Sequence, residues 1–84
     1  MFTVSIKIEQ YKKQFGSNLK KIREAKNMTQ FDLAAAMNEL SSESSIEKTT
    51  ISRIENGRTN VTLSTIIKLS LALDIDLKDL FFME

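Results

Sequence analysis

The stretch MTQFDLA at residues 28–34 and the stretch ISRIENGR at residues 51–58 decide the fold of this chain. Each places apolar side chains three or four positions apart, the spacing of one face of a helix. A threonine that can cap a helix N-terminus is the second residue of the first stretch, and a glycine that can end a helix lies near the close of the second. The two stretches predict helices over about residues 30–39 and 48–56.

The remainder of the chain has the same helical spacing. Apolar residues recur at steps of three or four from Val4 onward and predict a first helix over about residues 9–26, with Asn27 at its end. Thr62 is placed to cap a fourth helix rich in Leu and Ile, and Asp76 to cap a final turn or two. Proline is absent and glycine occurs twice. The expected fold class is all-α, a compact bundle of five helices.

Residues 1–8 allow two interpretations. Apolar and polar residues alternate there as in a strand, through Phe2, Val4, Ile6 and Ile8. The same segment also extends the helical spacing toward Tyr11. We therefore divide the chain into residues 1–8, an N-terminal arm or helical extension, and a single domain over residues 9–84.

Composition excludes several classes of function. The 84 residues contain no cysteine and no histidine, which removes disulfides, thiolate metal sites and the commonest general base. There is also no glycine-rich phosphate loop. No apolar run approaches the roughly 18 residues of a membrane span, and the first ten residues lack the pattern of a signal peptide. We expect a cytoplasmic protein that is not an enzyme, without metal, cofactor, small-molecule substrate or membrane.

Charge is unevenly distributed along the chain. The net charge is only +1, but residues 1–30 hold seven Lys or Arg and two Glu, an excess of +5. Residues 31–58 and residues 59–84 each stand at −2. The first helix could therefore present a basic face to a polyanion, although a solvated lysine-rich helix explains the charge equally well.

The helix predicted over residues 48–56 has two unlike sides. Ile51 and Ile54, together with Ile46, are expected to hold it against the core. The other side carries hydrogen-bonding and cationic groups, contributed by Lys48, Thr49, Ser52, Arg53 and Asn56. Such a face suits the major groove of DNA, where each base pair presents a distinct pattern of donors and acceptors. An ordinary solvated helix would also show it, so the helix alone leaves both interpretations open.

Taken together, the two stretches resemble the phage repressor and Cro-type helix-turn-helix family, also called the xenobiotic-response-element type. The residues that carry the resemblance are Thr29, Gln30, Leu33 and Ala34, followed by Ile51, Ser52, Ile54, Glu55 and Gly57. It extends from about Phe15 to Phe81, most of the chain. The resemblance implies a lambda-repressor-like fold and a sequence-specific DNA-binding transcription regulator.

The resemblance also implies roles for single residues. The helix from Gln30 corresponds to the positioning helix, and the helix from Lys48 to the recognition helix. The implied base contacts are Lys48, Thr49 and Arg53, and the implied phosphate contacts are Gln30, Ser52, Asn56 and Arg58. Arg23 and Glu55 match a pair that forms a partly buried salt bridge between the first and third helices. This assignment keeps a carboxylate away from the DNA.

The sequence departs from the family pattern at several places. Asn38 stands where a turn glycine is usual, and asparagine tolerates the left-handed conformation expected there. Compared with the family pattern, residues Glu39 to Ser45 resemble an insertion that lengthens the turn between helices 2 and 3, as a loop or as a longer second helix. Glu47 replaces a small polar residue that often touches phosphate, and Leu71 and Asp74 replace a common lysine and glycine.

The C-terminal segment is more apolar than a small domain readily buries. We expect Leu71, Phe82 and Met83 to form a self-complementary dimer interface, although all of this surface could instead pack within one chain. The dimer would read a palindromic operator in double-stranded DNA, most simply as a repressor, and a second regulatory protein could control it. An antitoxin-like module that binds another protein, with DNA binding secondary, is the alternative.

Overall fold

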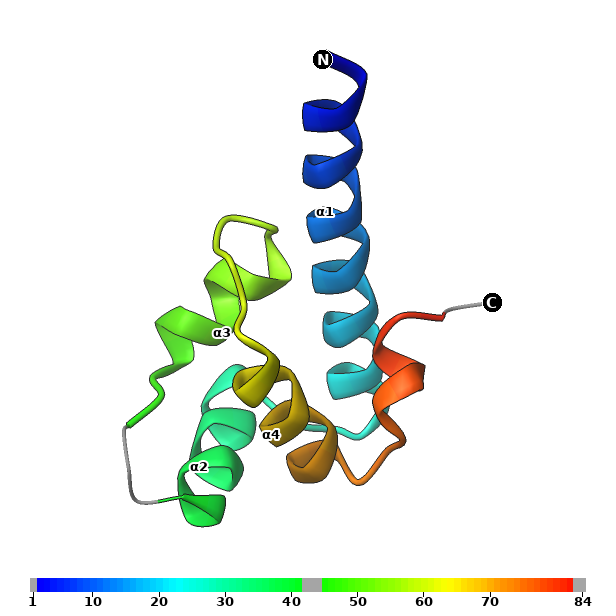
Figure 1. Ribbon diagram of the computed structural model, residues 1–84. Coiled ribbons are helices and arrows are strands. Elements are labelled where there is room, and N and C mark those ends of the chain that lie inside the picture. Colours follow the sequence, from blue (N-terminus) through cyan, green and yellow to red (C-terminus); the bar gives the residue numbers. More distant parts are fainter. Residues whose placement is uncertain (1, 42–44, 83–84) are drawn as a thin grey trace.

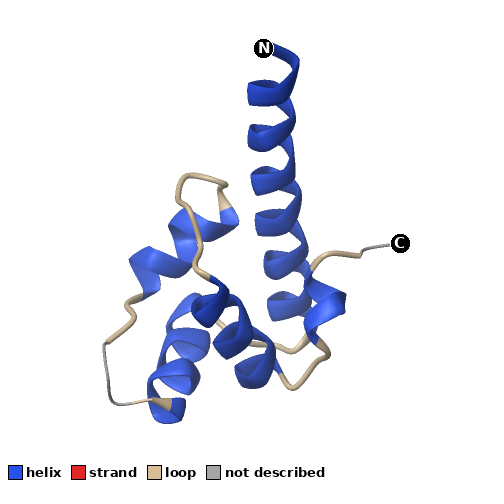
Figure 2. Ribbon diagram, viewed as in Figure 1, coloured by secondary structure: helices blue, strands red, loops and turns tan. Residues whose placement is uncertain are grey.

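The computed structural model describes residues 2–41 and 45–82, and every regular element in them is helical. Figure 1 shows the arrangement, and Figure 2 shows helices joined by loops. The elements in chain order are α1 (Phe2–Ala25), α2 (Gln30–Leu40), α3 (Lys48–Glu55), α4 (Leu63–Leu73) and the 3-10 turn η1 (Leu77–Leu80). The expected all-α class is therefore correct.

The expected fifth helix is not confirmed as an α-helix within the described residues. The segment after Asp76 forms one 3-10 turn, in which the N–H of Asp79 donates to the carbonyl of Asp76 and that of Phe81 to Lys78. The turn is fixed from outside, because the side-chain amide of Asn18 donates to the carbonyl oxygen of Leu80 at 3.0 Å.

The first helix is longer than expected. α1 has 24 residues and begins at Phe2, so residues 2–8, left open between an arm and an extension, are its first turns. Helix α1 packs on α3 and on η1, and its N-terminal half extends beyond the rest of the bundle (Figure 1).

Left-handed residues end three of the four α-helices in the described part of the chain. Asn27, Gly57 and Asp74 have φ of 58°, 69° and 55°. After each of them, the next backbone N–H donates to a carbonyl five residues earlier, at 2.9–3.1 Å, as in a Schellman motif. These sharp ends turn the chain back on itself and allow a bundle without proline.

Helices α2 and α4 begin at the capping residues expected from the sequence. The hydroxyl of Thr29 accepts from the N–H of Asp32, and the carboxylate of Asp32 accepts in return from the N–H of Thr29. The hydroxyl of Thr62 accepts from the N–H of Thr65 at 3.2 Å. Both caps satisfy donors that a helix leaves free in its first turn.

The core lies where the helices meet, and each of α1 to α4 and η1 contributes to it. Helix α2 packs on α3 and on α4, opposite the contact between α1 and α3. The buried apolar residues are Leu19, Leu33, Ala34, Met37, Ile51, Ile54, Leu69, Leu73 and Leu80. Together they hold α3 on its inner side only.

The connection between α2 and α3 departs from the expected turn. Asn38 is not left-handed: it lies within α2, which continues to Leu40. Its side chain instead pairs with the backbone of Ile46, donating to the carbonyl at 2.9 Å and accepting from the N–H at 2.7 Å. The lengthened connection is thus closed by one side chain just before α3 begins.

Candidate nucleic-acid interface

Helix α3 is held on one side and open on the other. Ile51 and Ile54, at 0% and 3% exposure, are buried against the core. Lys48, Thr49 and Arg53 are exposed, and Ser52 between them is half-buried. The result is a short helix whose outer face presents an ammonium, hydroxyls and a guanidinium without a large apolar side chain.

The start of α3 carries an acidic neighbour. Glu47 is its N-cap residue and is exposed, and its carboxylate accepts a long hydrogen bond of 3.4 Å from the hydroxyl of Thr49. The methyl group of Thr49 takes no part in that bond. Thr49 can therefore offer a methyl contact while its hydroxyl is held.

Arg23 and Glu55 form an ion pair between α1 and α3. The Nε of Arg23 donates to one carboxylate oxygen of Glu55 at 2.6 Å, and Nη2 donates to the other at 3.1 Å. Both side chains are buried, at 8% and 3% exposure. The hydrogen bonds that Arg23 donates to the Glu55 carboxylate raise the pKa of Arg23 above its ordinary value. Glu55 thus lies inside the domain and leaves the outer face of α3 without its negative charge.

Gln30 is tied to this pair. Its side-chain Nε2 donates to the Oε1 of Glu55 at 3.0 Å, and the residue is half-buried at the start of α2. A further bond of 2.7 Å runs from the guanidinium of Arg23 to the carbonyl of Met28. One network therefore fixes α1, the start of α2 and the inner edge of α3 relative to one another.

The residues after α3 form a tight exposed turn. Asn56 uses its side-chain nitrogen to cap the carbonyl of Ser52 at 2.8 Å, and Arg58 is exposed just beyond Gly57. A Cβ on Gly57 would lie 2.9 Å from the Cγ of Lys13, so this turn lies against α1. The backbone and Cγ of Lys13 thus lie against Gly57, a contact that sequence reasoning missed because the two residues are far apart in the chain.

Gly16 is a second residue whose role was missed. A Cβ at this buried position would overlap the carbonyl oxygen of Ile54 and lie 2.5 Å from that of Glu55. α1 and α3 therefore approach each other more closely than any side chain allows. The chain has only two glycines, and that scarcity was the available signal.

Two of the three expected dimer residues lie in the described part of the chain. Leu71 and Phe82 are exposed, at 60% and 75%. Met83 lies outside the described residues. Over residues 2–41 and 45–82 there is no helix long and apolar enough to cross a membrane, and no acidic cluster that could hold a metal ion.

Comparison with known proteins places this geometry in a family. A family model described as helix-turn-helix matches residues 19–80. The control protein C.MunI from Mycoplasma sp is 38% identical over 69 residues, which are 81% of this chain and 84% of that protein. The crystal structure of the restriction-modification controller protein C.AhdI from Aeromonas hydrophila superposes with a TM-score of 0.76 at 32% identity, covering 87% of this chain and 96% of that one. This chain therefore belongs to the helix-turn-helix family of the repressor and Cro type, whose members are DNA-binding transcription regulators and not enzymes.

Proposed function

We propose that this protein is a controller of restriction and modification genes that represses transcription by binding a palindromic operator as a homodimer. Two relatives whose names describe controllers support this setting, because the similarity to each spans more than four-fifths of both chains. The operator would lie in front of the genes it controls.

The outer face of α3 carries the proposal. Lys48, Thr49 and Arg53 are exposed on it, while the one carboxylate of that helix points inward to Arg23. Lys48 and Arg53 can donate to guanine O6 and N7, and Thr49 can touch a thymine methyl. We assign these three residues to base contacts.

Phosphate contacts would surround this face. The outward-facing candidates are Asn56 and Arg58, beyond the end of α3, and Ser52 on its flank. Gln30 stands at the start of α2, where helix N–H groups favour phosphate. One N–H of its side-chain amide is bonded to Glu55, so its share in phosphate binding would come from the second amide N–H and from its backbone N–H.

A homodimer gives this small face enough contacts. A helix of eight residues reaches few base pairs, and two copies placed roughly 34 Å apart would read two half-sites of one palindrome. The exposed Leu71 and Phe82, with Met83, are the interface we propose from the sequence.

The test is selection of bound duplexes from a random DNA pool by the intact protein at about physiological salt. We expect a two-fold symmetric motif that also occurs upstream of restriction or modification genes beside the gene for this protein. A reporter driven by that promoter should fall when the protein is supplied, and the variant Arg53→Ala should relieve the fall. An asymmetric motif would contradict the dimer, and a reporter that rises would contradict repression.

A further inference from the structure

The N-terminal half of α1 carries an uncovered apolar strip. Val4, Ile8 and Tyr11 are 60%, 51% and 72% exposed, and their spacing puts them on one helix face with Phe15. Further along α1 the same face supplies Leu19 to the core. The strip is therefore the core face of α1 continued beyond the bundle, in a segment that precedes the family match at residue 19.

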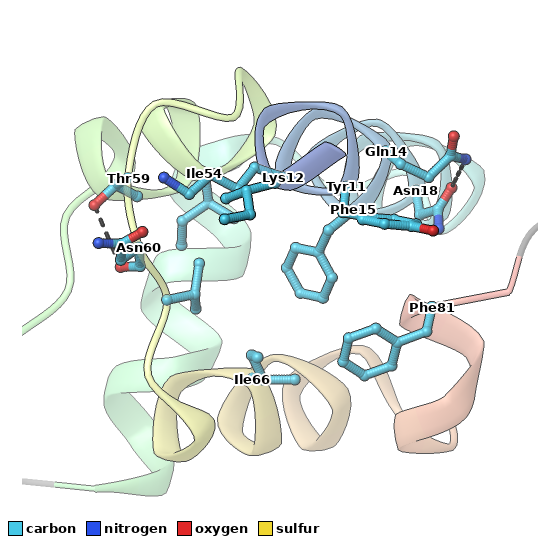
Figure 3. A pocket seen from close by; sticks show the side chains of 12 residues that line it. Tyr11, Lys12, Gln14, Phe15, Asn18, Ile54, Thr59, Asn60, Ile66 and Phe81 are labelled. Carbon is cyan, nitrogen blue, oxygen red and sulfur yellow. Dashed lines mark hydrogen bonds between the residues drawn. The ribbon is translucent and has the colours of Figure 1, made fainter. Parts of the chain in front are cut away.

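The strip leads into an apolar groove. The groove has a volume of about 480 Å³ and lies between α1, the α3–α4 connection, α4 and the C-terminal turn. Figure 3 shows Phe15 and Phe81 facing each other in the groove above Ile66. The centroids of the two rings are 5.4 Å apart. Ile8 and Tyr11 belong to both the strip and the groove, so the two form one surface.

Charge does not oppose a protein partner there. Among the groove-lining residues, Lys12 is the charged one, and its ammonium lies 3.7 Å from the carboxylate of Glu9. A second chain approaching the groove would meet apolar carbon, the ion-paired Lys12 and uncharged polar side chains, those of Gln14, Asn18, Thr59 and Asn60. A polyanion such as DNA would find Lys12 as the single cation among these lining residues, with the carboxylate of Glu9 beside it.

The accessible surface area of the chain exceeds that of a compact monomer by about the area that one partner buries in a dimer. The accessible area is 6012 Å², whereas a compact monomer of this mass exposes about 5,100 Å². The excess is on the order of 900 Å², close to the roughly 800 Å² that each partner buries in a stable interface. The extended α1 accounts for the elongated shape of 41 × 28 × 19 Å.

We propose that the strip and groove are the surface on which a second copy of this chain packs, with the strip of each protomer lying in the groove of the other. The inference deepens the proposed function, because it rests on the homodimer suggested above and names a further part of its interface. The groove adjoins that interface, since Phe81 lines it and Phe82 follows.

The arrangement is compatible with DNA binding. The groove takes Ile54 from the inner side of α3, while Lys48 and Arg53 lie on the exposed side. A partner in the groove therefore leaves the recognition face uncovered. Because the contact is apolar, association should persist at salt concentrations that release DNA.

The test compares two matched variants of the full chain by sedimentation equilibrium. Ile8→Glu places a charge in the strip, whereas Ile6→Glu places it two residues away on the opposite face at nearly equal exposure, 51% against 56%. We expect Ile8→Glu to raise the dimer dissociation constant on the order of 100-fold. Ile6→Glu should change it less than about threefold.

A measurement on the unaltered protein tests the inference even if a variant loses part of its helical structure. Tyr11 is the single tyrosine and tryptophan is absent, so intrinsic fluorescence reports on the strip alone. Acrylamide quenching of this emission should fall as the protein is concentrated through its dimerisation range.

The outcomes separate the two proposals. If quenching stays constant while the protein dimerises, or if Ile6→Glu and Ile8→Glu act alike and Leu71→Glu dissociates the dimer, the strip is not the interface and the proposed homodimer stands. If the protein remains a monomer even on the selected duplex, both this inference and the homodimer fall. DNA recognition by α3 would survive that result.

Discussion

The side chain of Asn38 hydrogen-bonds to both backbone groups of Ile46, as donor at 2.9 Å and acceptor at 2.7 Å. The amide thus copies the pairing that a neighbouring strand would give. It joins the last turns of α2 to the residue two positions before α3. Through this contact a connection longer than the family's tight turn still delivers α3 to the core.

Replacing Asn38 should loosen that connection. Asn38→Ala removes both bonds and leaves the N–H and carbonyl of Ile46 without their partner, which should cost about 1–3 kcal/mol in the free energy of unfolding. Urea denaturation checks this, with Glu39→Ala at the exposed neighbouring position as the control. Equal midpoints for the two variants would show that the loop holds α3 without the amide.

Breaking the buried ion pair should cost more than removing it. Glu55→Gln leaves the guanidinium of Arg23 buried without a counter-charge, and we expect a loss of about 3–5 kcal/mol. The double variant Arg23→Met with Glu55→Met should recover much of that loss, because no isolated charge remains. Thermal unfolding of the three proteins tests this. A double variant less stable than Glu55→Gln would contradict it.

Gly16 should tolerate no side chain. A methyl group there meets the carbonyl oxygens of Ile54 and Glu55, which are backbone atoms of the recognition helix and cannot rotate away. Gly16→Ala should therefore lower the unfolding free energy by about 1–3 kcal/mol and displace α3. Ser17→Ala, one exposed position along, is the matched control. Circular dichroism melts and the affinity for the selected duplex are the two readouts, and an unchanged melt would refute the close approach.

Arg53 and Arg58 should differ in what they contribute to DNA binding. Both are exposed, but Arg53 lies on the outer face of α3 and Arg58 beyond its end. Arg53→Ala should cost about 1–3 kcal/mol on the cognate duplex and relax the preference at one base position, whereas Arg58→Ala should weaken cognate and scrambled duplexes alike. Binding titrations at several salt concentrations measure both. If the two variants weaken both duplexes equally, Arg53 does not read a base.

Asp32 should titrate at lower pH in the folded chain than in the unfolded one. The backbone N–H of Thr29 donates to its carboxylate at 2.9 Å and holds the pKa of Asp32 below its ordinary value of 3.8. Since the folded pKa is depressed, the stability from this cap is complete above pH 3.8 and is lost as pH falls through the folded pKa. Carboxyl NMR titration in buffer and in urea gives the two midpoints. Coincident midpoints would show that the cap does not form in solution.

Much of this protein is determined by its sequence alone. Helices α2 to α4, and α1 apart from its first turns, lie close to where local spacing predicts them. Apolar periodicity and capping residues such as Thr29 and Thr62 act within one or two turns of chain. The recognition-helix motif, with isoleucines on one face and Arg53 on the other, is equally local. The pairing of Arg23 with Glu55 came from family resemblance, since no rule of spacing joins residues 32 positions apart.

Tertiary structure decided the features that depend on contact between distant segments. Asn38 could act as a left-handed turn residue or bond through its side chain to a distant backbone. It does the second, because α2 continues to Leu40 and Ile46 lies within reach of the amide. After Asp76, where local spacing favoured a helix, the chain forms a single 3-10 turn, and Asn18 of α1 donates to the carbonyl of its last residue, Leu80. The role of Gly16 follows from the α3 backbone packed against it, and the role of the strip on α1 follows from its exposure. Local sequence sets which conformations are cheap, and the packing of the whole chain selects among them.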